Sequence, residues 1–248
     1  MNLERYSRQE QLPYIGRSGQ EKLLSSSAVI VGCGALGTHS AECLARSGVG
    51  VIRIIDPECI ELSNLQRQCL FNESDVGAPK AVCAANRLSG INSDVRIEPV
   101  CERLTRQNAP ELLSGADIVI DAVDNLASRE EINRACVESG VPWIYGGIAG
   151  FRGMTMNVIP GGACFKCLMP GPPPDSEATA DSIGIIGPLA DMISAVQCAE
   201  AIKILVHGAQ SASVRRTLLY VDLRENKFDQ HEVIRLPNCP VCGGRNGN

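Results

Sequence analysis

Four cysteines in the second half of the sequence have the spacing of a metal site. Cys164 and Cys167 form one Cys-x-x-Cys pair, and Cys239 and Cys242 form another, each beside turn-forming residues. Four thiolates suit tetrahedral Zn²⁺ and leave no open coordination position, so we expect a zinc ion that stabilises the fold and takes no part in catalysis. Such a site would tie the C-terminal tail to the middle of the chain. A redox-active cysteine pair is the alternative.

A glycine turn near the N-terminus has the pattern of a nucleotide site. Gly32, Gly34 and Gly37 follow a short apolar run and precede a stretch of helical composition. The first glycine allows a tight turn, the second lets backbone N–H groups approach a phosphate, and the third lets a helix pack on a strand. Asp56 ends the next apolar run about twenty residues further on, where a carboxylate can accept hydrogen bonds from ribose hydroxyls. The pattern predicts nucleotide binding without identifying the nucleotide.

Two cations and an acid are expected at the same crevice. Arg67 lies near the end of a polar segment, 63–68, that follows Asp56. Lys80 follows Pro79, a residue suited to the first turn of a helix. Asp124 follows a later apolar run, and the ends of parallel strands border one ligand crevice. A carboxylate opposite a polyphosphate is the usual ligand of Mg²⁺, whereas capping of the next helix is the alternative role for Asp124. For each cation, an ordinary surface charge is the alternative.

Together these motifs resemble the ThiF/MoeB/HesA family, the prokaryotic relatives of ubiquitin-activating enzymes. The resemblance covers nearly the whole chain and rests on Arg-Tyr-Ser-Arg-Gln at 5–9, the glycine turn at 32–37, Asp56, Ser63 to Gln68, Pro79-Lys80, Asp121 to Asn125 and the four cysteines. It implies that ATP lies in the crevice with Asp56 at the ribose. Asn64, Arg67 and Lys80 would contact the phosphates, and Asp124 would bind Mg²⁺.

The same resemblance implies a homodimer in which Arg8 reaches the triphosphate held by the other subunit. From the sequence alone, Arg5 and Arg8 lie three residues apart and would share a helix face, which is also typical of a solvated basic surface.

The activity implied by the resemblance is adenylation of the C-terminal glycine of a ubiquitin-like sulfur carrier protein, of the ThiS or MoaD type, that ends in Gly-Gly. The carboxylate would attack the α-phosphorus of ATP and release pyrophosphate, while Arg8, Arg67, Lys80 and the metal neutralise the developing charge. A general base is not needed, because a carboxylate is already ionised near neutral pH. The activated carrier would serve sulfur transfer in cofactor biosynthesis, with a sulfurtransferase or a cysteine desulfurase as a further partner.

A segment rich in proline and small polar residues, 171–182, has the composition of a mobile or extended loop, and a disordered linker is one interpretation of it. In the resembling enzymes the corresponding region crosses over the active site. In several of them this loop holds a cysteine that forms a covalent link. In this sequence Ala180 occupies about that place, and residues 168–197 contain no cysteine. We therefore expect adenylation without a covalent intermediate on this loop.

Other functions remain open from the sequence. An NAD(P)-dependent Rossmann oxidoreductase would explain the glycine turn and Asp56 but not the two cations or the cysteines. A non-catalytic scaffold with a decayed site is opposed by the retained charged residues. The adenylated carboxylate could instead belong to a peptide or be linked to RNA.

The elements that position these residues form an α/β fold, a Rossmann-like doubly wound and mostly parallel sheet with an antiparallel C-terminal extension. The 248 residues favour a single adenylation domain. We expect an N-terminal helical arm over residues 1–24, a nucleotide-binding core over 25–160, and the crossover loop, a helix, strands and the zinc-bound tail over 161–248. The helix is predicted over 193–206, and the last strands are predicted over 217–221 and 232–236.

The composition excludes some partners. A net charge of −5 argues against nucleic acid as a partner. The N-terminus lacks the apolar core of a signal peptide, and no apolar run approaches the roughly 18 to 20 residues that span a bilayer. Most of the other cysteines stand alone inside helix-like or strand-like segments, as in reduced proteins. We therefore expect a cytoplasmic protein that does not bind membranes.

Overall fold

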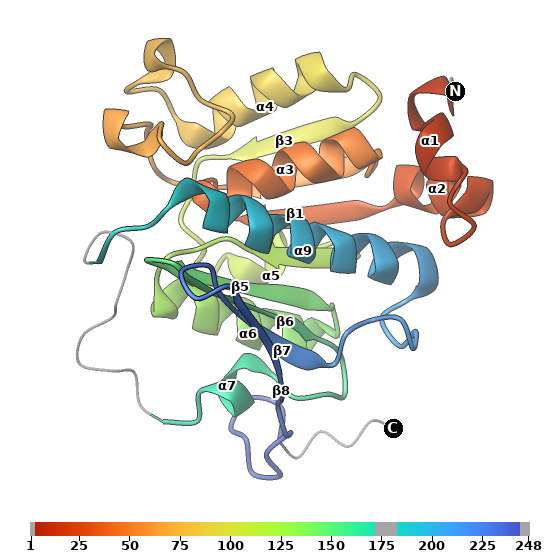
Figure 1. The fold of residues 1–248 in the computed structure, drawn as a ribbon, viewed down its shortest axis with the longest axis vertical. Helices are drawn as coiled ribbons and strands as arrows, with labels where there is room; N and C mark the ends of the chain where they lie inside the picture. The colour runs from red at the N-terminus through yellow and green to blue at the C-terminus, as the bar shows by residue number, and fades with distance from the viewer. Residues whose placement is uncertain (1–2, 172–182, 244–248) are drawn as a thin grey trace.

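A single sheet organises the fold, as a computed structural model of the chain shows (Figure 1). The structure describes residues 3–171 and 183–243, and within them the sheet has eight strands. They are β1 (Ser27–Val31), β2 (Val51–Ile55), β3 (Arg96–Val100), β4 (Ile118–Asp121), β5 (Trp143–Ala149), β6 (Arg152–Val158), β7 (Thr217–Asp222) and β8 (Lys227–Glu232).

The strand order is β3-β2-β1-β4-β5-β6-β7-β8. Neighbouring strands from β3 to β5 in this order are parallel, and β6, β7 and β8 each pair antiparallel with the strand before them. The predicted fold class, a doubly wound parallel sheet with an antiparallel C-terminal extension, is therefore confirmed. The order reverses between β1 and β4, which is where sheets of this kind bind their ligands.

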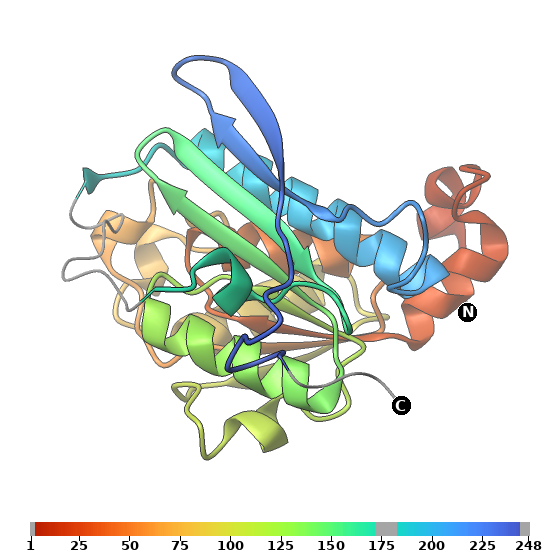
Figure 2. The same cartoon turned by 90° about the horizontal axis from the view of Figure 1, so that it is seen from below.

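Helices cover both faces of the sheet (Figure 2). One face carries α3 (Ala35–Ser47), α4 (Lys80–Ile91) and α9 (Gly187–His207), and the other carries α5 (Ala109–Leu112), α6 (Leu126–Ser139) and α7 (Phe165–Leu168). At the end where β1 begins lie η1 (Leu3–Tyr6), α1 (Ser7–Glu10) and α2 (Gly16–Ser25), and two short turns, η2 (Leu62–Asn64) and η3 (Glu73–Asp75), follow β2.

The alternation of side chains along β1 separates two apolar cores. Ala28 and Ile30 face α3, α4 and α9, whereas Val29 and Val31 face α5, α6 and α7. The helix predicted over 193–206 is confirmed as the C-terminal two thirds of α9 (Gly187–His207). It is apolar on more than one face because it packs on β4, β5 and β6 and also against α2 and α3.

The last predicted strand, over 232–236, is wrong. The strand that pairs with β7 is β8, which ends at Glu232. The turn before it is tight, because the carboxylate of Asp222 accepts hydrogen bonds from the backbone N–H groups of Arg224 and Glu225, and Asn226 has a φ of 51°. Residues 233–236 leave the sheet, and the backbone N–H of Leu236 then lies 3.4 Å from the sulfur of Cys167.

The glycine turn after β1 packs backbone against backbone. Gly32 has a φ of 96°, and a Cβ atom there would lie 2.4 Å from the carbonyl oxygen of Ala122. A Cβ atom on Gly37 would lie 2.0 Å from the carbonyl oxygen of Gly32. At Gly34 a Cβ atom would meet only the side-chain nitrogen of Gln68, at 3.7 Å. Gly32 and Gly37 therefore bring the turn, α3 and β4 together, and Gly34 leaves space above the turn.

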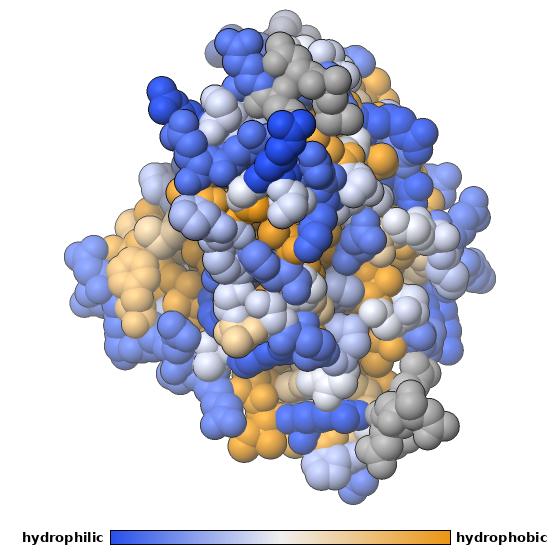
Figure 3. All heavy atoms as spheres, turned by 90° about the vertical axis from the view of Figure 1, so that its right-hand side faces the viewer, coloured by the Kyte–Doolittle hydropathy of each residue, from blue (hydrophilic) through white to orange (hydrophobic). Residues whose placement is uncertain are grey.

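The face that carries α1 and α2 is mainly hydrophilic, with separate smaller apolar areas (Figure 3). None of the helices in the described part of the chain has both the length and the apolarity that a bilayer crossing requires.

We predict that Gly37→Ala destabilises the protein although alanine is the better helix former. The overlap with the oxygen of Gly32 should lower the free energy of unfolding by about 3 kcal/mol or more in a urea titration. Gly90→Ala is the matched control, since Gly90 lies in α4 with no atom near its Cβ position. This substitution should stabilise the protein by up to about 1 kcal/mol. Equal stability of both variants and the wild type would contradict the prediction.

Candidate active site and metal centre

A cavity of about 770 Å³ lies at the carboxyl ends of β1, β2 and β4, a volume in the range of small-molecule sites. The glycine turn forms its floor, and the segments after β2 and β4 form two of its walls. The predicted site residues that line it are Gly32, Gly34, Asp56, Asn64, Arg67, Lys80 and Asp124. Residues up to about ninety positions apart in the sequence are thus brought to one crevice by the strand order.

Asp56 connects the end of β2 to the glycine turn. One carboxylate oxygen accepts a hydrogen bond of 2.6 Å from the backbone N–H of Cys33, and the other accepts one of 2.8 Å from the N–H of Glu58. Burial raises the pKa of Asp56, and the two N–H donors oppose that rise. The carboxylate is therefore fixed at the cavity, with further lone pairs to accept hydrogen bonds from a ligand.

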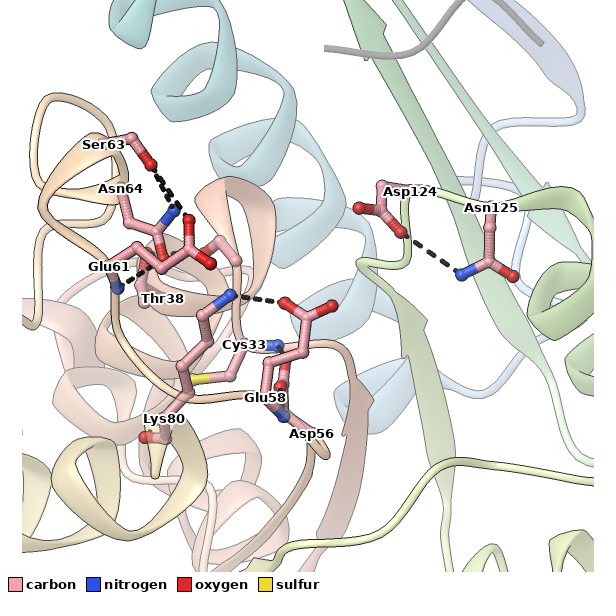
Figure 4. Close-up of polar contacts among 11 residues, drawn as sticks. Cys33, Thr38, Asp56, Glu58, Glu61, Ser63, Asn64, Lys80, Asp124 and Asn125 are labelled. Carbon is pink, nitrogen blue, oxygen red and sulfur yellow. Dashed lines mark hydrogen bonds and ion pairs between the residues drawn. The ribbon is translucent and has the colours of Figure 1, made fainter. Parts of the chain in front are cut away.

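Lys80 is the first residue of α4, and Pro79 is the cap residue just before it. The side chain of Lys80 is only 6% exposed, and its ammonium group lies 2.7 Å from a carboxylate oxygen of Glu58 (Figure 4). The side chain of Glu58 is 54% exposed. Glu58 also lines the cavity. Glu58 was not predicted as a site residue, although its position two residues after Asp56 was a usable signal.

Asn64, Arg67 and Gln68 lie on the turn after β2. The side-chain oxygen of Asn64 accepts a hydrogen bond from the N–H of Glu61 and closes η2, while Arg67 donates to the carbonyl oxygen of Ser63 at 3.0 Å. Gln68 is almost fully buried at the cavity, and its side-chain oxygen has no hydrogen-bond partner within residues 3–171 and 183–243. An unpaired acceptor at this position fits a ligand that carries N–H or O–H donors, as a nucleoside does.

Asp124 is exposed at the cavity just beyond β4, and the amide of Asn125 donates to it at 3.2 Å (Figure 4). The alternative role of Asp124 as a helix cap is wrong. Asn125 is the cap of α6, because its side-chain oxygen accepts a hydrogen bond of 2.9 Å from the N–H of Ser128. The carboxylate of Asp124 is thus left facing the cavity, in a position that suits a hydrated cation.

A buried ion pair holds the loop that carries Asp124. The fully buried carboxylate of Asp121 lies 2.7 Å from Arg129 of α6, which also donates to the carbonyl oxygens of Val123 and Gly146. Burial raises the pKa of Asp121, and the neighbouring guanidinium opposes the rise. Arg129 further lies 5.0 Å from the ring centre of Tyr145. This pair, which joins β4, α6 and β5 at the cavity, was not predicted from the sequence.

Two predicted residues do not line the cavity. Gly37 acts through packing, as described above. Arg8 is exposed on α1, where it donates to the side chain of Gln11 at 3.5 Å. Because α2 leads directly into the start of β1, the arm lies at the amino end of the sheet, opposite the cavity (Figure 1). Arg8 is therefore remote from the cavity of its own chain.

The four predicted cysteines form one buried cluster whose sulfur atoms all lie within 4.8 Å of one another. The Sγ separations are 4.0 Å for Cys164 and Cys167, 3.6 Å for Cys164 and Cys239, and 3.4 Å for Cys167 and Cys242. Sulfur atoms bound at about 2.3 Å to a tetrahedral ion are about 3.8 Å apart, whereas a disulfide needs about 2.05 Å. The spacing fits a four-thiolate metal site.

The predicted replacement of a loop cysteine by Ala180 lies outside the described residues.

The sequence matches the model of the ThiF family over residues 6–241. It is 43% identical over 244 residues to the sulfur carrier protein ThiS adenylyltransferase of Bacillus subtilis, with 96% of this chain and 71% of that protein covered. It is 38% identical over 242 residues to the SAMP-activating enzyme E1 of Haloferax volcanii, with 97% and 89% covered. The solved structure of E. coli MccB with ATP is similar at a TM-score of 0.83 and 27% identity, and the match covers 98% of this chain and 75% of that one.

Proposed function

This chain belongs to the ThiF family and is an adenylyltransferase, and on this basis we propose that it uses ATP to adenylate the C-terminal glycine of a ubiquitin-like sulfur carrier protein ending in Gly-Gly. The observation that carries the proposal is the meeting of Asp56, Arg67, Lys80 and Asp124 around one cavity at the strand ends. The family membership and the buried lysine leave the oxidoreductase alternative without support. Sulfur transfer from the adenylated carrier would serve cofactor biosynthesis.

Each of these cavity residues has a proposed role in bringing two anions, ATP and the carrier carboxylate, together. Asp56 accepts hydrogen bonds from the ribose hydroxyls, and Asn64 and Arg67 donate to the phosphates. Lys80, already desolvated and paired with Glu58, exchanges that carboxylate for a phosphate oxygen. The exposed carboxylate of Asp124 holds Mg²⁺, which neutralises phosphate charge when it is bound. The carrier carboxylate attacks the α-phosphorus and pyrophosphate leaves, with no proton to be removed.

Arg8 is proposed to act in a homodimer. Its place at the amino end of the sheet prevents a role in its own cavity, and the resemblance noted in the sequence assigns it to the triphosphate of the other subunit. If the guanidinium of Arg8 comes from the other subunit, each cavity is complete only in the dimer.

The four-cysteine cluster is proposed to hold structural Zn²⁺. The amide of Asn133 lies 3.7 Å from the sulfur of Cys164, and the N–H of Leu236 lies 3.4 Å from that of Cys167, so two of the thiolates have nearby donors. None of the twelve cysteines, all of which lie within the described residues, forms a disulfide, which supports a reducing cytoplasm as the location of the protein. A sulfurtransferase or a cysteine desulfurase is the proposed source of sulfur.

ATP–pyrophosphate exchange tests the proposed function. Exchange should require a carrier protein ending in Gly-Gly and should be lost when the last glycine is removed. Asp124→Asn should lower kcat/KM for exchange at least about 100-fold, because the cation ligand is lost. Asp94→Asn, at an exposed acid before β3, is the matched control and should exchange normally. No exchange with any carrier, together with NADH binding, would refute the adenylation proposal.

Mixed dimers test whether Arg8 acts in the other subunit. Arg8→Ala and Asp124→Asn should each be inactive, but co-expression with two affinity tags should give dimers with one complete cavity. Mixed dimers purified through both tags should have about half of the wild-type exchange rate, and an unselected random mixture should have about a quarter. Arg17→Ala, at an exposed arginine of α2 paired with Glu21, is the control and should remain active. A mixture as inactive as its parents, or full activity of Arg8→Ala, would exclude the role in the other subunit.

Metal analysis tests the cysteine cluster. We expect about one zinc ion per chain, and Cys242→Ser should lower both the zinc content and the midpoint of thermal unfolding, the latter by about 5 °C or more. Cys101→Ser, at an exposed cysteine outside the cluster, should change neither quantity. Wild-type protein that is free of zinc and keeps its thermal midpoint in the presence of a chelator would show that the cluster holds no structural zinc.

A further inference from the structure

The cavity continues from the nucleotide crevice onto an open face of the antiparallel strands. Alternate residues of β5, β6 and β7 point to this face. Gly147 lies opposite Met154, which lies opposite Tyr220, and Ala149 lies opposite Arg152. All five residues line the cavity. We call this surface the sheet wall, and its members are Gly147, Ala149, Arg152, Met154 and Tyr220. The glycine and alanine leave room for an extended chain to lie close to β5.

Arg152 is the charged residue of the sheet wall, and it is held in place. Its Nε lies 3.0 Å from a carboxylate oxygen of Asp222, whose side chain is only 7% exposed. The other oxygen of Asp222 is occupied by the turn N–H groups of Arg224 and Glu225. The carboxylate is therefore fixed from both sides, and it orients the guanidinium through one edge only.

The rest of the guanidinium is free to bind. The Arg152 side chain is 71% exposed, and within the described part of the chain its two terminal NH₂ groups make no hydrogen bond. The nearby charges of the hairpin compensate one another, since Arg224 pairs with Glu225 and Lys227 pairs with Asp229. An oriented guanidinium with two free donors suits a carboxylate, which it can bind through both oxygens.

The position of Arg152 indicates which part of a bound peptide it would contact. The phosphate-binding residues lie on the other side of the reversal point, after β2 and at the start of α4. From β1, which leads into the glycine turn, β6 is three strands away in the order β1-β4-β5-β6. At about 4.8 Å per strand this is about 14 Å, which an extended peptide spans with about four residues. A chain whose C-terminal carboxylate lies at the phosphates would thus reach Arg152 about four residues upstream.

We propose that Arg152, positioned by Asp222, binds an acidic side chain about four residues before the C-terminus of the carrier protein and so determines which carriers are adenylated. The inference rests on the proposed function, because it assumes that a protein tail enters the cavity. The hairpin of β7 and β8 projects beyond the helices beside this face, where the body of a protein substrate could rest (Figure 2).

The experiment compares carrier variants in the ATP–pyrophosphate exchange assay. The probe is a recombinant sulfur carrier protein ending in Gly-Gly, with Glu, Ala or Lys placed in turn at the third, fourth and fifth residues from its C-terminus. At one of these positions the wild-type enzyme should have a kcat/KM at least about 10-fold higher for Glu than for Lys. Arg152→Ala should remove this preference, and Arg152→Glu should reverse it.

The controls separate tail binding from other roles. Arg224→Ala, in the turn between β7 and β8 and outside the cavity lining, should keep the wild-type preference. The KM for ATP should be unchanged in every Arg152 variant, and a large increase would identify Arg152 as a phosphate ligand and overturn the inference. Equal kcat/KM for Glu and Lys at all three positions would also overturn it, while the exchange itself would uphold adenylation. Absence of exchange with every carrier would refute the proposed function instead.

Discussion

The close backbone contact at the glycine turn is the constraint on which the site depends. Three strands end there. The N–H of Gly32 donates to the carbonyl oxygen of Ile55 at the end of β2, and the N–H of Ala122 donates to that of Val31 at the end of β1. Side chains at the first and third glycines would push β4 and α3 away from the turn. The cavity therefore exists because backbones approach one another where most residues would hold them apart.

Around this turn three charged side chains are paired before any ligand arrives. Asp56 is bound by two N–H groups, Lys80 by Glu58, and Asp121 by Arg129. The pairs differ in burial, and that difference separates their roles. The Asp121 pair is buried and holds the loop after β4, whereas Glu58 is half exposed, so a phosphate oxygen can take its place beside Lys80. Such fixed groups stabilise developing charge without reorganising during the reaction.

The sequence was informative where function depends on local order along the chain. The glycine turn, Asp56 and Lys80 lie next to the ends of their own strands, so apolar runs and glycines were enough to place them. The cysteine pairs were recognisable because their chemistry is specific, although the two halves of the cluster are far apart in the sequence. The fold class followed from the same apolar runs.

What the sequence could not show depends on pairing between strands. Arg152 belongs to the cavity only because β5, β6 and β7 lie side by side, and no local pattern marks that order. β8 was misplaced because its sequence, KFDQHE, is almost wholly exposed and lacks the apolar alternation of a half-buried strand. The ion pair of Asp121 and Arg129 was also missed, because it joins a strand to a helix and depends on how the two pack together.

The two ends of the segment 172–182 are fixed independently of each other. On one side, the cysteine cluster holds α7; on the other, Ile185 bridges to Gly150 just before α9 begins. The cysteine cluster and the bridge at Gly150 therefore hold α7 and the start of α9 by separate contacts, so a change that loosens one of these anchors would leave the other intact.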